Sequence, residues 1–327
     1  MSVFTTDSVA VGDVTIRLAV RDFHLAAVAH RFDKSDFQAG RGNTVYLTRG
    51  GALVAHGRKL DDVTNAIISE NINELREPIS LDVHAYSSVL LSEADLSLNI
   101  TDLAKQVLNP QAAAVTAKIE SALADVIDGL TVDDTIVYDP QKPVGVFTKA
   151  RAAMRAKGVD IAQEPLVALV GTTAYDALLD SGALDAPALG GDPSALTKGA
   201  IGKIRGFDVV ESSAIGDTEI VFLTRDNSLY LASRAPEVPA GVAGAVSNFE
   251  GFELRTLQDY DAAYTAQRSV VSTMVGVGIL PAYKVTRTED AKRQGEADYT
   301  PGTAQIEEID EGLTVKADIE NVDSGDA

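Results

Sequence analysis

The sequence has no cysteine and no tryptophan among its 327 residues. Without cysteine there can be no disulfide, no thiolate zinc site, no iron–sulfur cluster and no cysteine nucleophile. The longest apolar runs, such as 166–170, fall far short of the roughly 20 residues that span a bilayer. The first residues also lack the basic and apolar regions of a targeting segment. We therefore expect no membrane contact and predict that the chain is made and kept in the cytoplasm.

Basic residues are also scarce. Lys and Arg together number 28 and Asp and Glu number 48, so the formal net charge is −20. Duplex DNA is bound chiefly through basic side chains that neutralise phosphates, so this balance excludes a DNA-binding protein with a broad basic face. The apolar fraction of 45% is ordinary for a folded protein, and the length suggests about two compact units.

The residue patterns of common active sites are missing. No nucleophile-elbow, zinc-protease or phosphate-loop motif is present, and His24 and His30 would point about 240° apart on a helix. Gly276-Val277-Gly278 lacks the third glycine of a dinucleotide loop, and the paired carboxylates at 61–62 and 133–134 are typical of solvated turns. We therefore predict no catalytic residue, no cofactor and no bound metal, and hence not an enzyme.

The first part of the chain predicts extended structure. Residues 1–39 are weakly patterned and are interpreted as an arm, in which 21–32 is expected to form a short helix because four apolar or aromatic residues share one face. Residues 40–90 read as a long β excursion with few core residues at its tip. Its return strand is expected over 79–85, where apolar and polar residues alternate. A lone two-stranded ribbon is marginal in water, so this excursion needs a partner.

The middle of the chain alternates helix and strand. The strongest helix signal lies at 110–129, with Asn109 as N-cap, Pro110 at the first helical position and Gly129 as the residue that ends the helix. A second helix is predicted over 142–157. Further predicted elements are a short helix that begins at 172 or 173 and strands at 165–170, 207–210, 219–224 and 229–233. This mixture indicates an α+β fold without strict βαβ order.

The last segment, 281–327, is strongly acidic. It holds 5 basic and 12 acidic residues, so its charge is 5 − 12 = −7. A charge run of this kind is most simply a solvated face. The alternation of apolar and polar residues over 313–320 nevertheless predicts a strand within it.

The order of these segments resembles a known family. The passages that carry the resemblance are ISLDVHAY at 79–86 with SEADL at 92–96, the helix at 110–129, ARAAM at 150–154 with LVALVGTTAY at 166–175, and AIGKIRGFDVVES at 200–212 with GFELR at 251–255 and DYD at 259–261. Their order and spacing resemble the major capsid proteins of tailed bacteriophages, which have the Hong Kong 97-type fold. The sequence looks most like coat proteins of phages that infect actinobacteria.

The resemblance implies a division of the chain. It implies an N-terminal arm at 1–39, an E-loop at 40–90, a P-domain at 91–135 and 250–280 with its spine helix at 110–129, an A-domain at 136–249, and an acidic C-terminal extension at 281–327 outside the family core. That extension is expected to dock on a neighbouring subunit or a cement protein. The family's covalent cross-link between a loop Lys and an Asn cannot be assigned. Lys59 and Asn248 have the right residue types and no supporting surroundings.

The resemblance also implies a function and partners. It implies a structural subunit that self-assembles into pentamers and hexamers of an icosahedral shell, located in the virion and assembled in the cytoplasm of the host bacterium. The shell would enclose the double-stranded DNA genome without sequence-specific binding. Because the arm is too short to hold a scaffolding segment, a separate scaffolding protein is expected, beside a portal and, as a further candidate, a decoration protein.

Two alternatives stay open at the level of sequence. One is an encapsulin-like protein compartment that holds cargo within the same fold. The other, from a different class, is a hydrolase that uses a metal held by carboxylates. Genomic neighbours would separate the first from a phage capsid, and a metal assay on the purified protein would test the second.

Overall fold

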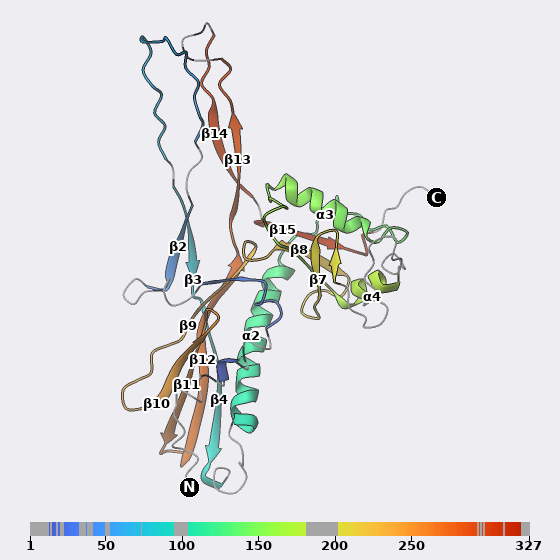
Figure 1. The fold of residues 1–327 in the computed structure, drawn as a ribbon. Helices are drawn as coiled ribbons and strands as arrows, with labels where there is room; N and C mark the ends of the chain where they lie inside the picture. Colours follow the sequence, from blue (N-terminus) through green and yellow to red (C-terminus); the bar gives the residue numbers. More distant parts are fainter. Residues whose placement is uncertain are drawn as a thin grey trace.

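The computed structural model describes residues 13, 15–17, 19, 23–32, 37, 42–49, 53–72, 74–94, 104–180, 202–292, 294, 296, 298–309 and 311–321. Figure 1 shows three parts: a lower half with a sheet and a long helix, a second sheet with its own helices to one side, and a narrow projection that rises from the first sheet. No helix among these residues is long and apolar enough to cross a membrane.

A six-stranded sheet, here called the central sheet, forms the lower half. Its strands are β1 (His30–Phe32), β4 (Val83–Ser92), β9 (Leu229–Arg234), β10 (Ala243–Phe249), β11 (Phe252–Asp261) and β12 (Ala266–Ile279). The order is β1-β9-β12-β11-β10, and β4 pairs with β12. β4 and β9 both pair with β12 at 274–275, so they must lie on opposite edges of that strand.

One helix covers one face of the central sheet. α2 (Asn109–Asp128) buries an apolar stripe that includes Val115, Ile119 and Leu123, in the 3–4 spacing of an amphipathic helix. Both ends differ from the sequence prediction. A π-helical turn, η3 (Ala104–Leu108), runs directly into the helix, so Asn109 makes no capping bond. Gly129 ends the helix at a φ of −69°, without the left-handed conformation that favours glycine there.

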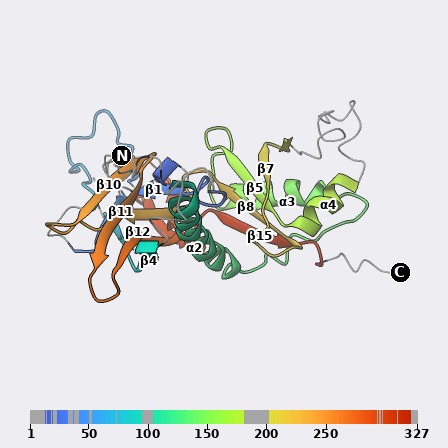
Figure 2. The same ribbon diagram turned by 90° about the horizontal axis from the view of Figure 1, so that it is seen from below.

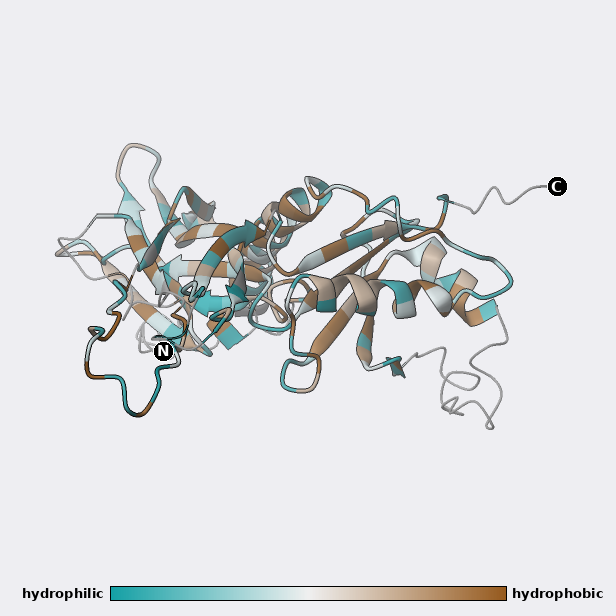
Figure 3. Ribbon diagram, turned by 90° about the horizontal axis from the view of Figure 1, so that it is seen from above, coloured by the Kyte–Doolittle hydropathy of each residue, from teal (hydrophilic) through white to brown (hydrophobic). Residues whose placement is uncertain are grey.

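The second sheet, here called the distal sheet, has the order β15-β8-β5-β7-β6. Its strands are β5 (Leu166–Val170), β6 (Lys203–Ile204), β7 (Phe207–Glu211), β8 (Glu219–Thr224) and β15 (Thr314–Asp318). α3 (Gly145–Ala156) and α4 (Thr172–Asp180) cover one face of it, and Figures 2 and 3 show both helices beside these mostly hydrophobic strands. Phe147, Phe207 and Phe222 meet edge to face in the layer between, with ring centroids 5.0 to 6.0 Å apart.

The segment 21–32 is not the predicted helix. Its described residues, 23–32, form turns followed by β1, which pairs in parallel with β9. The carboxylate of Glu120, on α2, accepts hydrogen bonds from the backbone N–H groups of His24, Leu25 and Ala26 at 2.8 to 3.1 Å. Because these tertiary bonds and the burial of Phe23 against the sheet decide the conformation, the helical spacing was misleading.

The predicted return strand is two strands. β3 (Leu75–Ser80) pairs with β2 (Thr44–Arg49), whereas β4 joins the central sheet. The chain changes partners at 81–82, where Leu81 N–H donates to Asn43 O and Asp82 N–H donates to Val275 O. Alternation of side chains continues through such a change, so the pattern alone could not reveal it.

The sheet topology also divides the chain differently from the predicted boundaries. β9 and β10, which fall within 136–249, pair in the central sheet. The extension at 281–327 contacts its own chain: β13 (Ala282–Thr288) and β14 (Thr303–Ile309) form a hairpin beside the loop at 53–72, and β15 pairs with β8. β15 is buried on both faces at 314–317, and it covers the edge that β8 would otherwise leave open.

We expect the ion pair of β15 to be necessary for the distal sheet. Lys316 Nζ lies 2.7 Å from Glu219 Oε1, and the two side chains are 4% and 18% exposed. Lys316→Met should lower the free energy of unfolding by about 3–5 kcal/mol, because it leaves a buried carboxylate unpaired. Urea unfolding of the unassembled chain measures this. The double variant Lys316→Met/Glu219→Met should recover most of the loss, and equal losses in both variants would contradict the role of the pair.

Candidate assembly surface

Two ribbons form the projection of Figure 1, which we call the tower. The first is β2–β3 with its loop 53–72, and the second is the hairpin β13–β14. Each is only two strands wide, and such a ribbon is marginally stable in water by itself. The tower is therefore held by contacts between its two ribbons.

Those contacts run along the tower from base to tip. At the base the hydroxyl of Tyr283 donates to the carboxylate of Glu77. Higher up, Arg287 Nε donates to the backbone oxygen of Leu53 at 3.1 Å. At the tip Gln294 bonds the loop through its backbone, whose N–H donates to Gly57 O at 2.8 Å, and through its side chain, whose Nε2 donates to the backbone oxygen of residue 66 at 2.8 Å.

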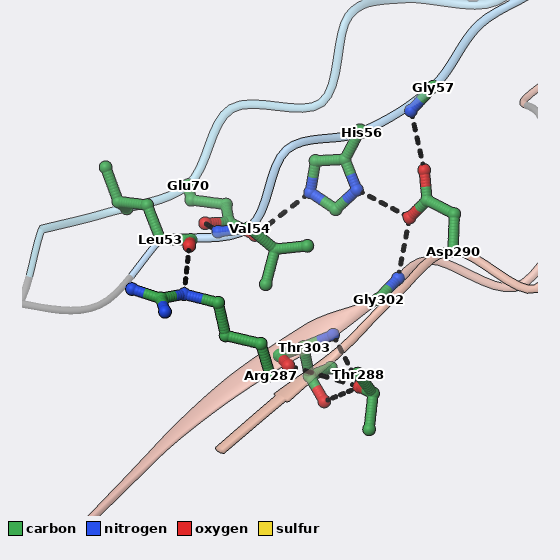
Figure 4. Close-up of polar contacts among 10 residues, drawn as sticks. All are labelled: Leu53, Val54, His56, Gly57, Glu70, Arg287, Thr288, Asp290, Gly302 and Thr303. Atoms are coloured by element: carbon green, nitrogen blue, oxygen red, sulfur yellow. Dashed lines mark hydrogen bonds and ion pairs between the residues drawn. The ribbon is translucent and has the colours of Figure 1, made fainter. Parts of the chain in front are cut away.

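A histidine between two carboxylates forms the centre of this contact (Figure 4). His56 Nδ1 lies 2.8 Å from Asp290 Oδ1, and its Nε2 lies 2.9 Å from Glu70 Oε1. The side chains of His56 and Asp290 are only 13% and 9% exposed. Asp290 also accepts from the backbone N–H groups of Gly57 at 2.7 Å and Gly302 at 2.8 Å. Two carboxylate partners require both ring nitrogens to donate, which only the imidazolium form can do.

The pKa values of the three groups are shifted accordingly. The hydrogen bond to Asp290 raises the pKa of His56 above its ordinary value, more than burial lowers it. The N–H of Gly302, followed by His56, lowers the pKa of Asp290 to about 2. The N–H of Val54 lowers the pKa of Glu70, with a smaller contribution from His56. The cluster is therefore an ion triad in mildly acidic solution.

The root of the tower depends on a glycine. A Cβ atom added to Gly276, on β12, would lie 1.8 Å from the backbone oxygen of Ser80 at the end of β3. Only glycine allows the tower to cross the central sheet this closely. Gly276 belongs to the Gly-Val-Gly sequence that lacks the third glycine of a dinucleotide loop. Its role in the structure is to let the backbone at Ser80 approach β12 closely.

The tip of the tower exposes apolar side chains. Leu60 is 106% exposed, Val63 92%, Ile67 79% and Ile72 64%. The turn that presents them is ordered by Asp62, which accepts from the side chain of Asn65 and from backbone N–H groups of the same turn, and these bonds hold the pKa of Asp62 well below its usual range. The apolar tip is thus an ordered surface that this chain leaves uncovered.

The central sheet has a second uncovered apolar surface, here called its open face. Val246, Arg255, Ser272 and Tyr86 follow one another across β10, β11, β12 and β4, so their side chains share the face opposite α2. Leu90 lies four residues beyond Tyr86 and points the same way. Tyr86 is 66% exposed, Leu90 52% and Val246 38%.

The structure separates the residues that the sequence singled out for chemistry. His24 and His30 lie in the arm, and the paired carboxylates serve turns: Asp62 as described, and Asp133, which accepts from Thr135 N–H at 2.9 Å. β10, which contains Asn248, is at the opposite end of the molecule from the loop that contains Lys59 (Figure 1). Among the described residues, no three His, Asp or Glu side chains form a group that could hold a metal.

Sequence reasoning missed the contact between the two ribbons. It treated the tail as separate and left His56 and Asp290, 234 residues apart, without a role. The loop at 40–90 lacked a partner strand, but the extended pattern read in the tail, over 313–320, corresponds to β15, which pairs with β8 and not with the loop. Nothing in either pattern specified that the two belong together.

Comparison with solved structures defines the class of fold. The structure of Mycobacterium phage Che8 matches 79% of this chain over 87% of its own, with 17% identity and a TM-score of 0.58. The match to the capsid of cyanophage P-SCSP1u covers 77% of this chain and 86% of the cyanophage chain, with 13% identity and a TM-score of 0.55. The match to the capsid of Ralstonia phage GP4 covers 93% of this chain and 90% of the phage chain, with 11% identity and a TM-score of 0.52.

At the level of sequence alone, no protein-family model matches the chain and no curated protein matches it significantly. The fold is nevertheless defined. It is the Hong Kong 97-type fold of phage major capsid proteins, α+β as predicted, and the resemblance in fold to these proteins, the structure of a mycobacteriophage included, is confirmed. The similar structures are structural proteins and not enzymes.

We predict that the tower is held most firmly in mildly acidic solution. A raised pKa of His56 stabilises the contact below its ordinary value of 6.5, and this stabilisation is lost as pH rises through the raised value. The lowered pKa values of Asp290 and Glu70 stabilise it above about pH 4 and fail only in stronger acid. Amide-exchange protection factors over 53–72, corrected for intrinsic rates, should therefore fall several-fold between pH 5.5 and pH 9.

His56→Gln should remove this pH dependence, because glutamine is uncharged throughout. His84→Gln is the matched control, since His84 lies exposed on β4 outside the tower, and it should keep the dependence. Equal pH profiles in wild type and His56→Gln would contradict the assigned role of the triad.

Proposed function

We propose that this chain is the major capsid subunit of a tailed phage and that its copies assemble into pentamers and hexamers of an icosahedral shell. The observation that carries the proposal is the pair of uncovered apolar surfaces, the tip of the tower and the open face of the central sheet, on a capsid fold. Contiguous exposed apolar surface marks sites of protein association. Obligate assemblies typically bury about 2,000 Å² or more per interface, which surfaces of this kind can supply.

The two surfaces favour ring closure over a two-fold dimer. Because the tip and the open face are different and lie on different parts of one chain, a contact between them is head-to-tail. Such heterologous contacts generate a closed ring when the rotation from one copy to the next adds up to a full turn. The tower reaches well beyond its own sheet in Figure 1, which supports its reaching a neighbouring copy.

The division of the chain into capsid parts is also part of the proposal. We assign the arm to 1–39 and the E-loop to 40–90. The central sheet with α2 corresponds to the P-domain, and the distal sheet with α3 and α4 to the A-domain. The central-sheet strands β1, β4, β9 and β10 then join the P-domain, the hairpin β13–β14 joins the E-loop and β15 joins the A-domain.

The proposed contents of the shell are double-stranded DNA, held without sequence-specific binding. The net charge of −20 supports this, because a wall of the same sign as the phosphates repels DNA within a Debye length of about 8 Å and does not grip it. The proposed partners are a separate scaffolding protein, a portal and a decoration protein. The proposed location is the virion after assembly in the host cytoplasm. A solved shell with a strongly basic inner wall would refute the charge argument.

The tip provides the test of self-assembly. Leu60→Ser/Ile67→Ser should leave the thermal unfolding of the monomer unchanged, because both side chains are exposed, and should reduce shell formation at least tenfold. Negative-stain electron microscopy and sedimentation of the expressed protein, with and without the candidate scaffold, measure this. Deletion of 50–70 should give a soluble chain that forms no shells.

The matched control is Asn71→Ser, which changes an exposed polar residue of the same loop and should assemble as wild type does. Normal shells from the deletion variant would overturn the proposed role of the loop. Shells that enclose a protein cargo in place of DNA would favour the encapsulin-like alternative.

A further inference from the structure

The two helices of the distal sheet carry opposite charges. α3 contains Lys149, Arg151 and Arg155 and no acidic residue. α4 contains Asp176 and Asp180, one turn apart, and no basic residue. In a chain with 48 acidic and 28 basic residues, a helix whose charges are all positive departs from the average composition. We call the three cations of α3 the basic face and the two carboxylates of α4 the acidic face.

Both faces point to solvent. The apolar sides of the helices, with Phe147 and Met154 on α3 and Leu178 on α4, are buried against the distal sheet, which leaves Arg155 and Asp180 among the exposed residues of the opposite sides. Figure 1 shows α3 along the upper side of this part of the molecule and α4 along its lower side. The opposite charges thus lie on two different helices of one domain, both on the same face of the distal sheet.

These charges are largely unused within the chain. The side chains of Arg155, Asp176 and Asp180 make no hydrogen bond or ion pair with any residue that the structure describes. Lys149 Nζ donates to a backbone oxygen, Val137 O, at 3.0 Å. Arg151 also donates to a backbone oxygen, that of Arg205. Among the residues that the structure describes, no carboxylate therefore pairs with the basic face.

We propose that the basic face of α3 binds the acidic face of α4 on a second copy of this chain. The proposal rests on the proposed self-assembly and names one of its interfaces. A head-to-tail contact pairs opposite charges at every junction of a ring, whereas a two-fold contact would place α3 against α3 and like charges together. Complementary charges steer two copies together and set their relative orientation. Like charges make the opposite orientation unfavourable.

Charge reversal tests the pairing. Lys149→Glu/Arg155→Glu makes both faces acidic, and Asp176→Lys/Asp180→Lys makes both basic. Each double variant should lose shell formation by at least about tenfold, because like charges then meet at every junction. The quadruple variant, which has the wild-type net charge, should form shells again. Circular dichroism and thermal unfolding check that each unassembled chain is folded.

A mixture of the two double variants gives a second readout. Opposite charges meet only where the two variants alternate, and alternation closes rings with an even number of copies and no others. A 1:1 mixture should therefore form hexamers, seen as flat or tubular assemblies, and no pentamers. Mass photometry and electron microscopy distinguish these products.

The possible results separate this inference from the proposed function. Wild-type protein that forms no shells contradicts the proposed self-assembly itself. Normal shells from Lys149→Glu/Arg155→Glu overturn only the α3–α4 pairing. The pairing is also overturned if the double variants lose assembly and the quadruple variant does not restore it. The basic face then binds another partner, such as a scaffolding protein or nucleic acid.

Discussion

The 14-residue strand β12 is paired along both edges, and the rest of the molecule is arranged around that constraint. β4 occupies one edge, while β11 and β9 share the other end to end. Through these neighbours β12 joins segments that are nearly 200 residues apart in sequence. At Gly276, where a Cβ atom would lie 1.8 Å from the backbone oxygen of Ser80, it also allows the backbone of the tower to pass close by. A central strand with no free edge is a rigid base, from which the tower and the distal sheet can project in fixed directions.

The tower shows how a marginal element becomes a usable arm. A ribbon of two strands with an apolar tip would have to be ordered by its partner at the moment of binding, at a cost in conformational entropy. Here the hairpin of the same chain orders it first, through His56, Asp290 and Gln294. The acidic tail is in this respect a brace and not a loose appendage. Its carboxylates act both as ion-pair partners within the tower and as part of the overall negative charge.

The candidate surfaces have a common physical character. The tip and the open face present exposed apolar side chains, and the two charged faces present charges that no opposite charge among the described residues neutralises. The shifted pKa values of His56, Asp290 and Glu70 belong to the contact that holds the two ribbons of the tower together. The exposed apolar surfaces are consistent with the proposed function, which is exerted through interfaces.

Local patterns were sufficient for some elements and misleading for others. The spacing of apolar residues predicted α2 to within a residue or two, because a 20-residue amphipathic helix carries its own periodicity. The same reasoning failed over 21–32, where three backbone N–H groups are taken by Glu120 of a distant helix. Alternation over 79–85 was real, yet it could not show that the chain changes sheets at Leu81.

The sequence by itself determined the α+β class, the long helix, the loop that needs a partner, the charge of −20 and, through the order of its motifs, the capsid fold. Only the tertiary structure decided which strands share a sheet, that the tail braces the loop and completes the distal sheet, and which surfaces stay uncovered. The physical reason is the range of the interactions. Helical periodicity and turn chemistry act over a few residues, whereas the pairing of His56 with Asp290, or of β15 with β8, depends on backbone edges that come together only when the whole chain has folded.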